Sequence, residues 1–305
     1  MTKTADPTRP RRAGEPGPTR IGPATFRWGE RTFVMGILNL TPDSFSGDGL
    51  LAPGGDPVEA AVAAGRAMVE DGADLLDVGG ESTRPGHAPV DEAEERLRVV
   101  PVLAALRSAL PATPLSVDTT KPAVAEAALA AGADLINDVW GVGDDERLAR
   151  LAADHGVPLI VMHNRAEPRY TTFLPELIAD LQRALERALR LGVPWDDLVI
   201  DPGFGFGKTP EHNLELLREL STLRMLGRPI LLGTSRKSTL GRVLDLPVSE
   251  RLEATLATTA LGIAGGIDIV RVHDVGPNVR AARISDAVVR ASSMLPSGPA
   301  EGGPS

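Results

Sequence analysis

From residue 33 onward, short apolar runs alternate along the chain with longer segments that have helical spacing. The apolar runs predict eight β-strands, at 33–38, 75–78, 115–117, 135–136, 159–162, 198–200, 230–232 and 269–272. The segments between them predict helices at 58–71, 92–109, 123–131, 146–155, 174–191, 213–220, 249–264 and 278–291. Continuously apolar strands that alternate with amphipathic helices are typical of a parallel sheet covered by helices.

Eight strand–helix units favour a closed (β/α)8 barrel, the TIM-barrel architecture, over an open doubly wound sheet, which remains the alternative. The 305 residues fit one barrel of roughly 250 residues plus tails. We therefore predict an α/β fold with one barrel domain over 23–293. Residues 1–22 and 294–305 are polar and rich in proline or glycine, so we expect disordered tails there.

Some features are structural rather than chemical. Residues 25–31 predict a small hairpin that closes the floor of the barrel. The sequence Gly-Ala-Asp occurs at 72–74 and at 132–134, and Gly-Ile-Asp follows at 266–268, each between a helix and the next strand. A glycine in left-handed conformation that ends a helix accounts for this placement.

Composition narrows the class of protein. The chain has no cysteine, which excludes disulfides, thiolate metal sites and a cysteine nucleophile, and fits a reducing compartment. The first residues lack the apolar core of a signal peptide, and no run reaches the roughly 18 apolar residues that cross a membrane. We therefore expect a cytoplasmic protein without a membrane partner. The net charge of −9 argues against a nucleic-acid partner but leaves room for a local anion site.

Polar residues follow directly after every predicted strand. These runs are 39–46, 79–86, 118–121, 137–139, 162–164, 201–208, 233–238 and 271–274. In a barrel enzyme, the active site is built from the loops at the carboxyl ends of the strands. Helix capping accounts for some of these residues, but it does not explain Arg84, Lys237, Arg271 or His273, because a cation opposes the dipole at a helix N-terminus. These cations indicate an anionic ligand.

A second group of residues indicates a flat heterocycle. Asp118, Asn137 and Asp201 come from three different strands and offer acceptors for the N–H edge of a planar ring. Lys237 adds a donor for a carbonyl or a ring nitrogen. The residue types alone do not say which heterocycle binds. The glycine-rich run at 203–207 does not match a phosphate-binding P-loop, and the five histidines form no zinc motif.

Taken in order, seven of these runs resemble the dihydropteroate synthases of the folate pathway. The matching runs are 39–46, 81–85, 116–119, 137–138, 201–208, 235–238 and 271–274, and the resemblance extends over about 33–290. It implies a transferase that joins 6-hydroxymethyl-7,8-dihydropterin diphosphate to p-aminobenzoate and releases diphosphate. It also implies a homodimer. Since no Phe-Gly insertion follows Lys237 and Ser238, it implies a sulfonamide target as well.

The resemblance implies a role for each residue of the site. It implies pterin contacts for Asp118, Asn137, Met162, Asp201, Phe206 and Lys237. It implies diphosphate contacts for Thr83, Arg84, Arg271 and His273, and a p-aminobenzoate pocket that includes Phe45, Pro85, Lys237 and Ser238. Asn39 would ligate Mg2+, with help from Asp43. The residues expected to act in catalysis are Asp43, Arg84, Asp118 and Lys237.

Two other functions remain open at this point. A methyltetrahydrofolate–corrinoid methyltransferase is also a pterin-binding barrel, but it would not need the 39–46 loop or the Arg271 and His273 anion site. A non-catalytic pterin-binding paralogue would not need the diphosphate site either.

Overall fold

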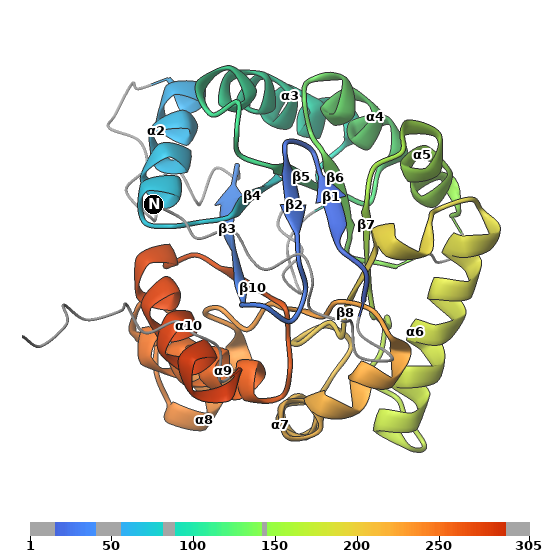
Figure 1. Cartoon of the computed structure of the whole chain (residues 1–305), viewed down its shortest axis with the longest axis vertical. Helices are drawn as coiled ribbons and strands as arrows, with labels where there is room; N and C mark the ends of the chain where they lie inside the picture. Colours follow the sequence, from blue (N-terminus) through green and yellow to red (C-terminus); the bar gives the residue numbers. More distant parts are fainter. Residues whose placement is uncertain (1–15, 41–55, 82–88, 142–144, 291–305) are drawn as a thin grey trace, which may run out of the picture.

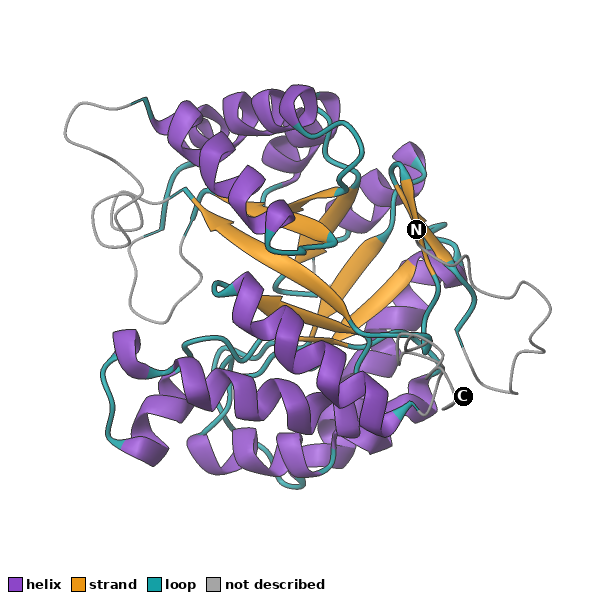
Figure 2. Cartoon of the chain, turned by 60° about the vertical axis from the view of Figure 1, so that its left-hand side comes forward, coloured by secondary structure: helices purple, strands orange, loops and turns teal. Residues whose placement is uncertain are grey.

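The computed structural model describes residues 16–40, 56–81, 89–141 and 145–290, and in these ranges the chain forms a barrel of parallel strands surrounded by helices (Figures 1 and 2). The barrel strands are β3 (Phe33–Asn39), β4 (Leu75–Gly79), β5 (Leu115–Asp118), β6 (Leu135–Asp138), β7 (Leu159–Met162), β8 (Leu198–Asp201), β9 (Leu231–Leu232) and β10 (Ile269–Val272). Their order in the sheet is β8-β7-β6-β5-β4-β3-β10-β9. A parallel bridge between Ile200 and Ile230 joins the two ends, so the predicted closed barrel is confirmed.

The helices lie between the strands, as the periodicity predicts. They are α2 (Pro57–Glu70), α3 (Glu92–Ala109), α4 (Pro122–Ala130), α5 (Arg147–His155), α6 (Phe173–Arg190), α7 (Pro210–Arg218), α8 (Ser238–Leu244), α9 (Leu252–Ala264) and α10 (Val275–Val289). Short 3-10 turns cover Trp195–Asp197, Leu220–Leu226 and Val248–Glu250. Two helices begin three residues earlier than predicted. Helix α7 begins at Pro210 rather than at 213, because the Thr209 side chain caps it by accepting a hydrogen bond from the His212 backbone N–H. Helix α10 begins at Val275 rather than at 278. The start predicted at 249 falls in the last 3-10 turn, and α9 begins at Leu252.

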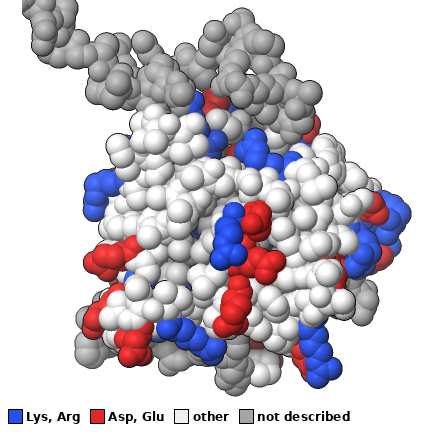
Figure 3. All heavy atoms as spheres, turned by 90° about the horizontal axis from the view of Figure 1, so that it is seen from below, with Lys and Arg blue, Asp and Glu red and all other residues white. Residues whose placement is uncertain are grey.

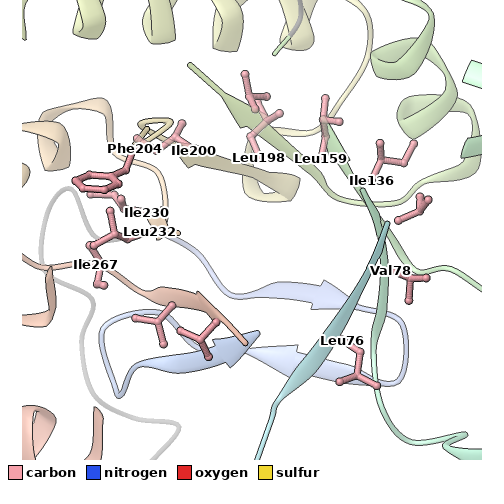
Figure 4. Close-up of a cluster of buried hydrophobic side chains, with 14 of the residues drawn as sticks. Leu76, Val78, Ile136, Leu159, Leu198, Ile200, Phe204, Ile230, Leu232 and Ile267 are labelled. Atoms are coloured by element: carbon pink, nitrogen blue, oxygen red, sulfur yellow. The ribbon is translucent and has the colours of Figure 1, made fainter. Parts of the chain in front are cut away.

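Two apolar clusters hold the barrel together. The larger one lies between the outer faces of the strands and the helices, and Figure 4 shows a part of it, including Leu76, Val78, Ile136 and Leu159. The smaller one fills the lower interior of the barrel with residues from successive strands, among them Met35, Leu75, Leu135, Ile160, Val199, Leu231 and Ile269. Because the lower interior is packed, the room for polar chemistry lies at the carboxyl ends of the strands.

A hairpin covers the floor of the barrel. Strand β1 (Thr19–Ile21) pairs antiparallel with β2 (Ala24–Phe26), and the buried side chains of Ile21, Phe26 and Trp28 join the lower interior cluster. A hairpin therefore closes the floor as expected, but it lies at 19–26 rather than at the predicted 25–31, and the disordered tail predicted over 1–22 is too long. Alternate burial of Thr19 and Ile21 around exposed Arg20 is a strand pattern that the polar composition of this segment concealed. Residues 1–15 and the C-terminal tail predicted over 294–305 lie outside the described ranges.

The repeated Gly-x-Asp segments are structural, as predicted. Gly72, Gly132 and Gly266 have φ values of 103°, 109° and 89°. The aspartate that follows each of them accepts a hydrogen bond from a backbone N–H at or near the start of a neighbouring strand: Asp74 from Val34, Asp134 from Leu115 and Asp268 from Ile230. These contacts set the level at which each strand enters the barrel, and therefore the level at which its polar end emerges.

Candidate active site

The register of the strands brings polar residues to one level at the mouth of the barrel. Asn39 of β3 lies beside Gly79 of β4, Gly79 lies beside Asp118 of β5, and Asp118 lies beside Asn137 of β6. Further round the barrel, Met162 of β7 lies beside Asp201 of β8. Residues that are far apart in the sequence therefore form one ring at the carboxyl ends of the strands.

An ion-pair network around Arg271 occupies the centre of this ring. The Arg271 Nε donates to Asp77 Oδ2 at 2.5 Å, and its Nη2 donates to Asp118 Oδ2 at 2.7 Å. The Asn137 Nδ2 also donates to Asp77 Oδ2, at 3.0 Å. Asp77, Asn137 and Arg271 come from alternate strands, whose inward side chains share a layer in a barrel. The network therefore holds Arg271 and Asn137 in fixed positions.

Burial gives this network unusual electrostatics. It raises the pKa of Asp118 to about 7, and although the Arg271 guanidinium opposes the rise, Asp77 and Glu95 add to it. Burial alone would lower the pKa of Arg271, but the Asp77 and Asp118 carboxylates raise it, so the guanidinium stays charged. Within the described residues, Asp77 Oδ1, Asp118 Oδ1 and Ser116 Oγ are buried and have no hydrogen-bond partner. Buried acceptors without partners are costly, and a ligand with N–H donors would satisfy them.

Asp201 and Lys237 face the same end of the barrel from the opposite side. Asp201 is buried, and its Oδ1 accepts from the Gly203 N–H at 2.7 Å. Burial raises the pKa of Asp201, whereas the Gly203 hydrogen bond and the charges of Lys237 and Arg271 oppose the rise. The Lys237 Nζ lies 3.8 Å from the ring centroid of Phe206, a cation–π contact. An acceptor, a cation and an aromatic ring therefore converge here.

The loops after β9 and β10 are joined to each other. The Ser235 hydroxyl lies 3.0 Å from His273 Nδ1, and the His273 backbone N–H donates to Ser235 Oγ at 3.2 Å. Arg236, which has a left-handed φ of 58°, forms two hydrogen bonds to the Asp274 carboxylate at 3.1 and 2.8 Å. These contacts fix the two backbone residues directly before Lys237.

The structure places the predicted residues unequally. Asp118, Asn137 and Arg271 form one network, and Asp201, Phe206 and Lys237 share the same end of the barrel. Met162 is buried at the end of β7, Asn39 ends β3, Ser238 begins α8, and His273 follows β10. Asp43, Phe45, Thr83, Arg84 and Pro85 lie outside the described residues.

Sequence reasoning missed Asp77. This side chain is fully buried in the middle of β4 and contacts both Arg271 and Asn137. The sequence does carry a signal for it, since a carboxylate within the apolar run Leu75–Val78 has to be paired with a cation or hydrogen-bonded to be tolerated there. Asp77 lies inside the strand rather than at its carboxyl end, where the polar residues of a barrel site are expected.

The described residues contain neither a clustered metal site nor a helical membrane span. No group of three or more histidine, cysteine, aspartate or glutamate residues in them could hold a metal ion. No helix in the same ranges is both long and apolar enough to span a bilayer.

Comparison with known proteins identifies the class of protein to which this barrel and its polar mouth belong. A family model described as pterin binding enzyme matches residues 35–273, and the chain belongs to that family. Among its relatives, the dihydropteroate synthase of Clostridium beijerinckii is 48% identical over 89% of this chain and 99% of the relative. The dihydropteroate synthase of Bacillus subtilis is 47% identical over 88% of this chain and 92% of the relative. The resemblance to dihydropteroate synthases is therefore confirmed.

Solved structures agree with this assignment. A Clostridium difficile dihydropteroate synthase, crystallised in the presence of pteroic acid, has a TM-score of 0.82 and 48% identity, and the alignment covers 87% of this chain and 99% of that one. A Yersinia pestis dihydropteroate synthase in complex with a sulfonamide drug has a TM-score of 0.83 and 38% identity, over 90% of this chain and all of that one.

Proposed function

We propose that this protein is a dihydropteroate synthase, a transferase that condenses 6-hydroxymethyl-7,8-dihydropterin diphosphate with p-aminobenzoate to give 7,8-dihydropteroate and diphosphate. One observation carries the proposal: in a member of the pterin binding enzyme family, buried acceptors converge on Arg271 at the barrel mouth. The p-aminobenzoate and pterin ligands of related solved structures support the same two substrates.

The acceptors at the mouth suit the N–H edge of a pterin ring. Asp118 Oδ1 is buried without a partner, and Asp201 has an oxygen besides the one that binds Gly203. The aminopyrimidinone edge of a pterin offers parallel N–H donors to a carboxylate, and its carbonyl accepts from an ammonium group such as that of Lys237. The Met162 and Phe206 side chains supply apolar surface for the flat ring.

The reaction exchanges a C–O bond for a C–N bond at the pterin methylene. Diphosphate departs with the electron pair of the C–O bond, and the positive charge that develops is delocalised into the dihydropterin ring. The Asp118 carboxylate, when ionised, stabilises that charge. The arylamine nitrogen then attacks the methylene and releases a proton to solvent. A weakly basic arylamine needs no strong general base.

Arg271 and His273 are the described residues that we assign to the diphosphate. Asp77 and Asp118 bind Arg271 through Nε and Nη2, so an anion would approach the other guanidinium nitrogen, Nη1. His273 is oriented by Ser235. The proposed diphosphate contacts of Thr83 and Arg84 stay predictions, as does the p-aminobenzoate pocket with Phe45, Pro85, Lys237 and Ser238.

Asn39 ends β3 at the mouth, and its amide oxygen is a hard ligand of the kind that Mg2+ prefers. Mg2+ is usually held by one or two protein oxygens together with phosphate oxygens and water. We propose that Asn39, with Asp43, holds it. When bound, it would offset the negative charge of the diphosphate.

We further propose a homodimer formed by the face of α9 and α10. Leu261 of α9 and Ile284 and Val288 of α10 are large apolar side chains that are more than half exposed. Figure 3, which views the molecule from the side at the bottom of Figure 1, shows broad areas without charged side chains. Exposed apolar side chains grouped on neighbouring helices are typical of a surface that binds a partner.

An assay of diphosphate release tests the proposed function. The purified protein is given the pterin diphosphate, p-aminobenzoate and Mg2+, and both diphosphate and dihydropteroate are measured. We expect release that depends on p-aminobenzoate and yields equal amounts of the two products. Binding of a pterin without turnover would instead support the non-catalytic paralogue, and methyl transfer from methyltetrahydrofolate to a corrinoid would support the methyltransferase.

A variant sharpens the assay. Arg271→Met removes the guanidinium from both Asp77 and Asp118, so we expect kcat/KM for the pterin diphosphate to fall by at least 100-fold, about 2.7 kcal/mol. Arg150→Met, at an exposed ion pair with Glu146, serves as the control and should keep the wild-type rate. An Arg271→Met enzyme with an unchanged rate would contradict the assigned site.

A further inference from the structure

A chain of polar side chains lies beside the proposed pterin site, at the ends of β7 and β8. The Asp180 Oδ2 of α6 lies 3.1 Å from His163 Nε2. On its other side, His163 Nδ1 lies 2.9 Å from the Nζ of Lys208. The Lys208 Nζ also donates to the backbone carbonyl of Phe206 at 2.9 Å. Nothing in the proposed reaction accounts for Asp180, His163 or Lys208.

The direction of the hydrogen bonds in this chain follows from the protonation of His163. Burial lowers the pKa of His163 to about 4, and the Lys208 charge adds to this effect, whereas Asp180 opposes it. The imidazole is therefore neutral near pH 7. Burial acts to raise the pKa of Asp180, but hydrogen bonds from Arg165 and His163 bring it below its usual value, so this carboxylate only accepts. The single imidazole proton lies on Nε2, and Nδ1 is free to accept from Lys208.

Lys208 in turn fixes the backbone of Phe206. Its ammonium group is largely surrounded by protein, and burial lowers its pKa to about 7, with the Asp201 charge opposing. The short contacts of its Nζ go to His163 Nδ1 and to the Phe206 carbonyl. The ring of Phe206 is the one that Lys237 contacts at 3.8 Å. A hydrogen bond to the Phe206 backbone therefore acts on a ring and a cation of the proposed pterin site.

The glycine-rich segment around Phe206 is closely packed against its neighbours, so it has little room to move. Gly203 has a φ of 69°, and a Cβ atom on it would lie 1.9 Å from the His163 carbonyl oxygen. The Tyr170 hydroxyl donates to the Gly207 carbonyl at 2.8 Å. The segment thus rests directly on the backbone that carries His163, and the position of Phe206 depends on the contact between His163 and Lys208.

We propose that Asp180, His163 and Lys208 are positioning residues: they hold the Phe206 backbone so that its ring and the Lys237 ammonium group present one fixed surface to the pterin. The inference rests on the proposed function, because it concerns the same site. None of the three residues needs to touch a substrate. Their effect should be larger on the affinity for the pterin, whose proposed site includes both Phe206 and Lys237, than on that for p-aminobenzoate, whose proposed pocket includes only Lys237 of this pair.

Two histidine variants and one lysine variant test the proposal. An asparagine at 163 places its amide oxygen near the position of Nδ1, where it can accept from Lys208. A glutamine there reaches the position of Nε2 and removes the Nδ1 acceptor, so that Lys208 keeps only the Phe206 carbonyl of its two short contacts. We expect His163→Gln and Lys208→Met to raise the KM for the pterin diphosphate at least tenfold. The KM for p-aminobenzoate should change less than threefold. His163→Asn keeps the acceptor for Lys208 and loses only the Asp180 contact, so it should raise the KM for the pterin diphosphate less than His163→Gln does.

Binding of pteroic acid, measured by calorimetry, is the second readout, with Arg150→Met as the control. A wild type that binds pteroic acid without turnover contradicts the proposed function alone, and the same variants then test the inference by their pteroic acid Kd. Equal effects of His163→Asn and His163→Gln overturn the inference, and so does a folded Lys208→Met protein with wild-type affinity for the pterin. If Lys208→Met does not fold, the two histidine variants decide.

Discussion

Asp138 lies one residue beyond the Arg271 network, at the end of β6, and it is one of the pH-sensitive groups of the described chain. Its side chain is buried, and its Oδ1 accepts from the Trp140 N–H at 3.0 Å. Burial raises its pKa to about 7, although the Trp140 hydrogen bond opposes the rise, and the Asp118 charge adds to it. The folded protein therefore keeps a proton on Asp138 at a pH at which the unfolded chain has lost it.

The sign of the pH effect follows from this difference in bound protons. Between about pH 4 and pH 7 the folded state binds more protons than the unfolded state, so Asp138 makes the free energy of unfolding decrease as the pH rises. Asp138→Asn keeps an oxygen for Trp140 and removes the titration. We expect the stability of this variant relative to wild type to increase from pH 5 to pH 7.5 by on the order of 1–3 kcal/mol, measured by urea unfolding. Parallel pH profiles of the two proteins would refute the assignment.

The sequence predicted a site residue correctly where a polar side chain directly follows an apolar strand. Asp118 and Asn137 follow apolar runs and stand where barrel enzymes place their chemistry, and the structure joins both to Arg271. Asp77 was not predicted, because the pattern gives the bounds of a strand but not the cation that a buried carboxylate meets across the barrel. The partner of Asp77 is 194 positions away in the sequence.

At the scale of elements, two glycines with left-handed backbone differ in how strictly a glycine is required. They are Gly203 in the loop after β8 and Gly156 at the end of α5. Gly203 and Gly156 both have left-handed φ values, 69° and 61°. A Cβ atom on Gly203 would collide with the His163 carbonyl oxygen, whereas a Cβ atom on Gly156 would have no atom within 4 Å. At both positions, a residue with a side chain would be destabilised by the left-handed backbone conformation. At Gly203 it would also collide with the His163 carbonyl oxygen.

This pair gives a matched test. We expect Gly156→Ala to cost about 1–2 kcal/mol, the penalty of left-handed backbone for a residue with a side chain. Gly203→Ala should cost a further 1–3 kcal/mol and should also raise the KM for the pterin, because the loop must shift away from His163. Thermal unfolding and steady-state kinetics measure both effects. Similar losses for the two variants would show that the packing of Gly203 on His163 is unimportant.

The sequence predicted which segments form strands and helices better than it predicted the residues at which they begin. Apolar runs located every barrel strand, because each strand is buried on both faces and is largely apolar, with single polar residues such as Asp77 and Arg271. The β1–β2 hairpin was misplaced, since its alternate burial extends over only a few residues of a segment rich in proline and glycine. The starts of α7 and α10 were set too late, because apolar spacing does not extend into the first turn of a helix, where caps and proline decide.

At the scale of the whole molecule, the proposed dimer can be tested with one charge. Ile284 on α10 is 65% exposed, and Leu97 on α3 is 71% exposed, so a glutamate at either place is tolerated by the monomer. We expect Ile284→Glu to weaken the dimer at least tenfold, about 1.4 kcal/mol, while Leu97→Glu leaves it intact. Analytical ultracentrifugation over a dilution series measures both. A dimer that survives Ile284→Glu would place the interface elsewhere, and a monomeric wild type would refute the homodimer.

The architecture as a whole was predictable because eight alternations of strand and helix leave few alternatives. The sequence could not show how the barrel closes. Strand β9 has two residues, and the seam to β8 consists of the bridge between Ile200 and Ile230. The position of that seam depends on packing between residues far apart in the chain.

The aromatic floor also gives the molecule an optical property. Trp28 is buried against Phe26 and Phe33, and its indole N–H donates to Thr19. The other two tryptophans, Trp140 and Trp195, are 52% and 41% exposed, and Trp140 follows the end of β6 near the mouth. Fluorescence from the floor should therefore shift to longer wavelength only when the barrel opens, while emission near β6 is the signal to monitor during titration with a pterin. One chain thus carries separate reporters of unfolding and of ligand binding without any added label.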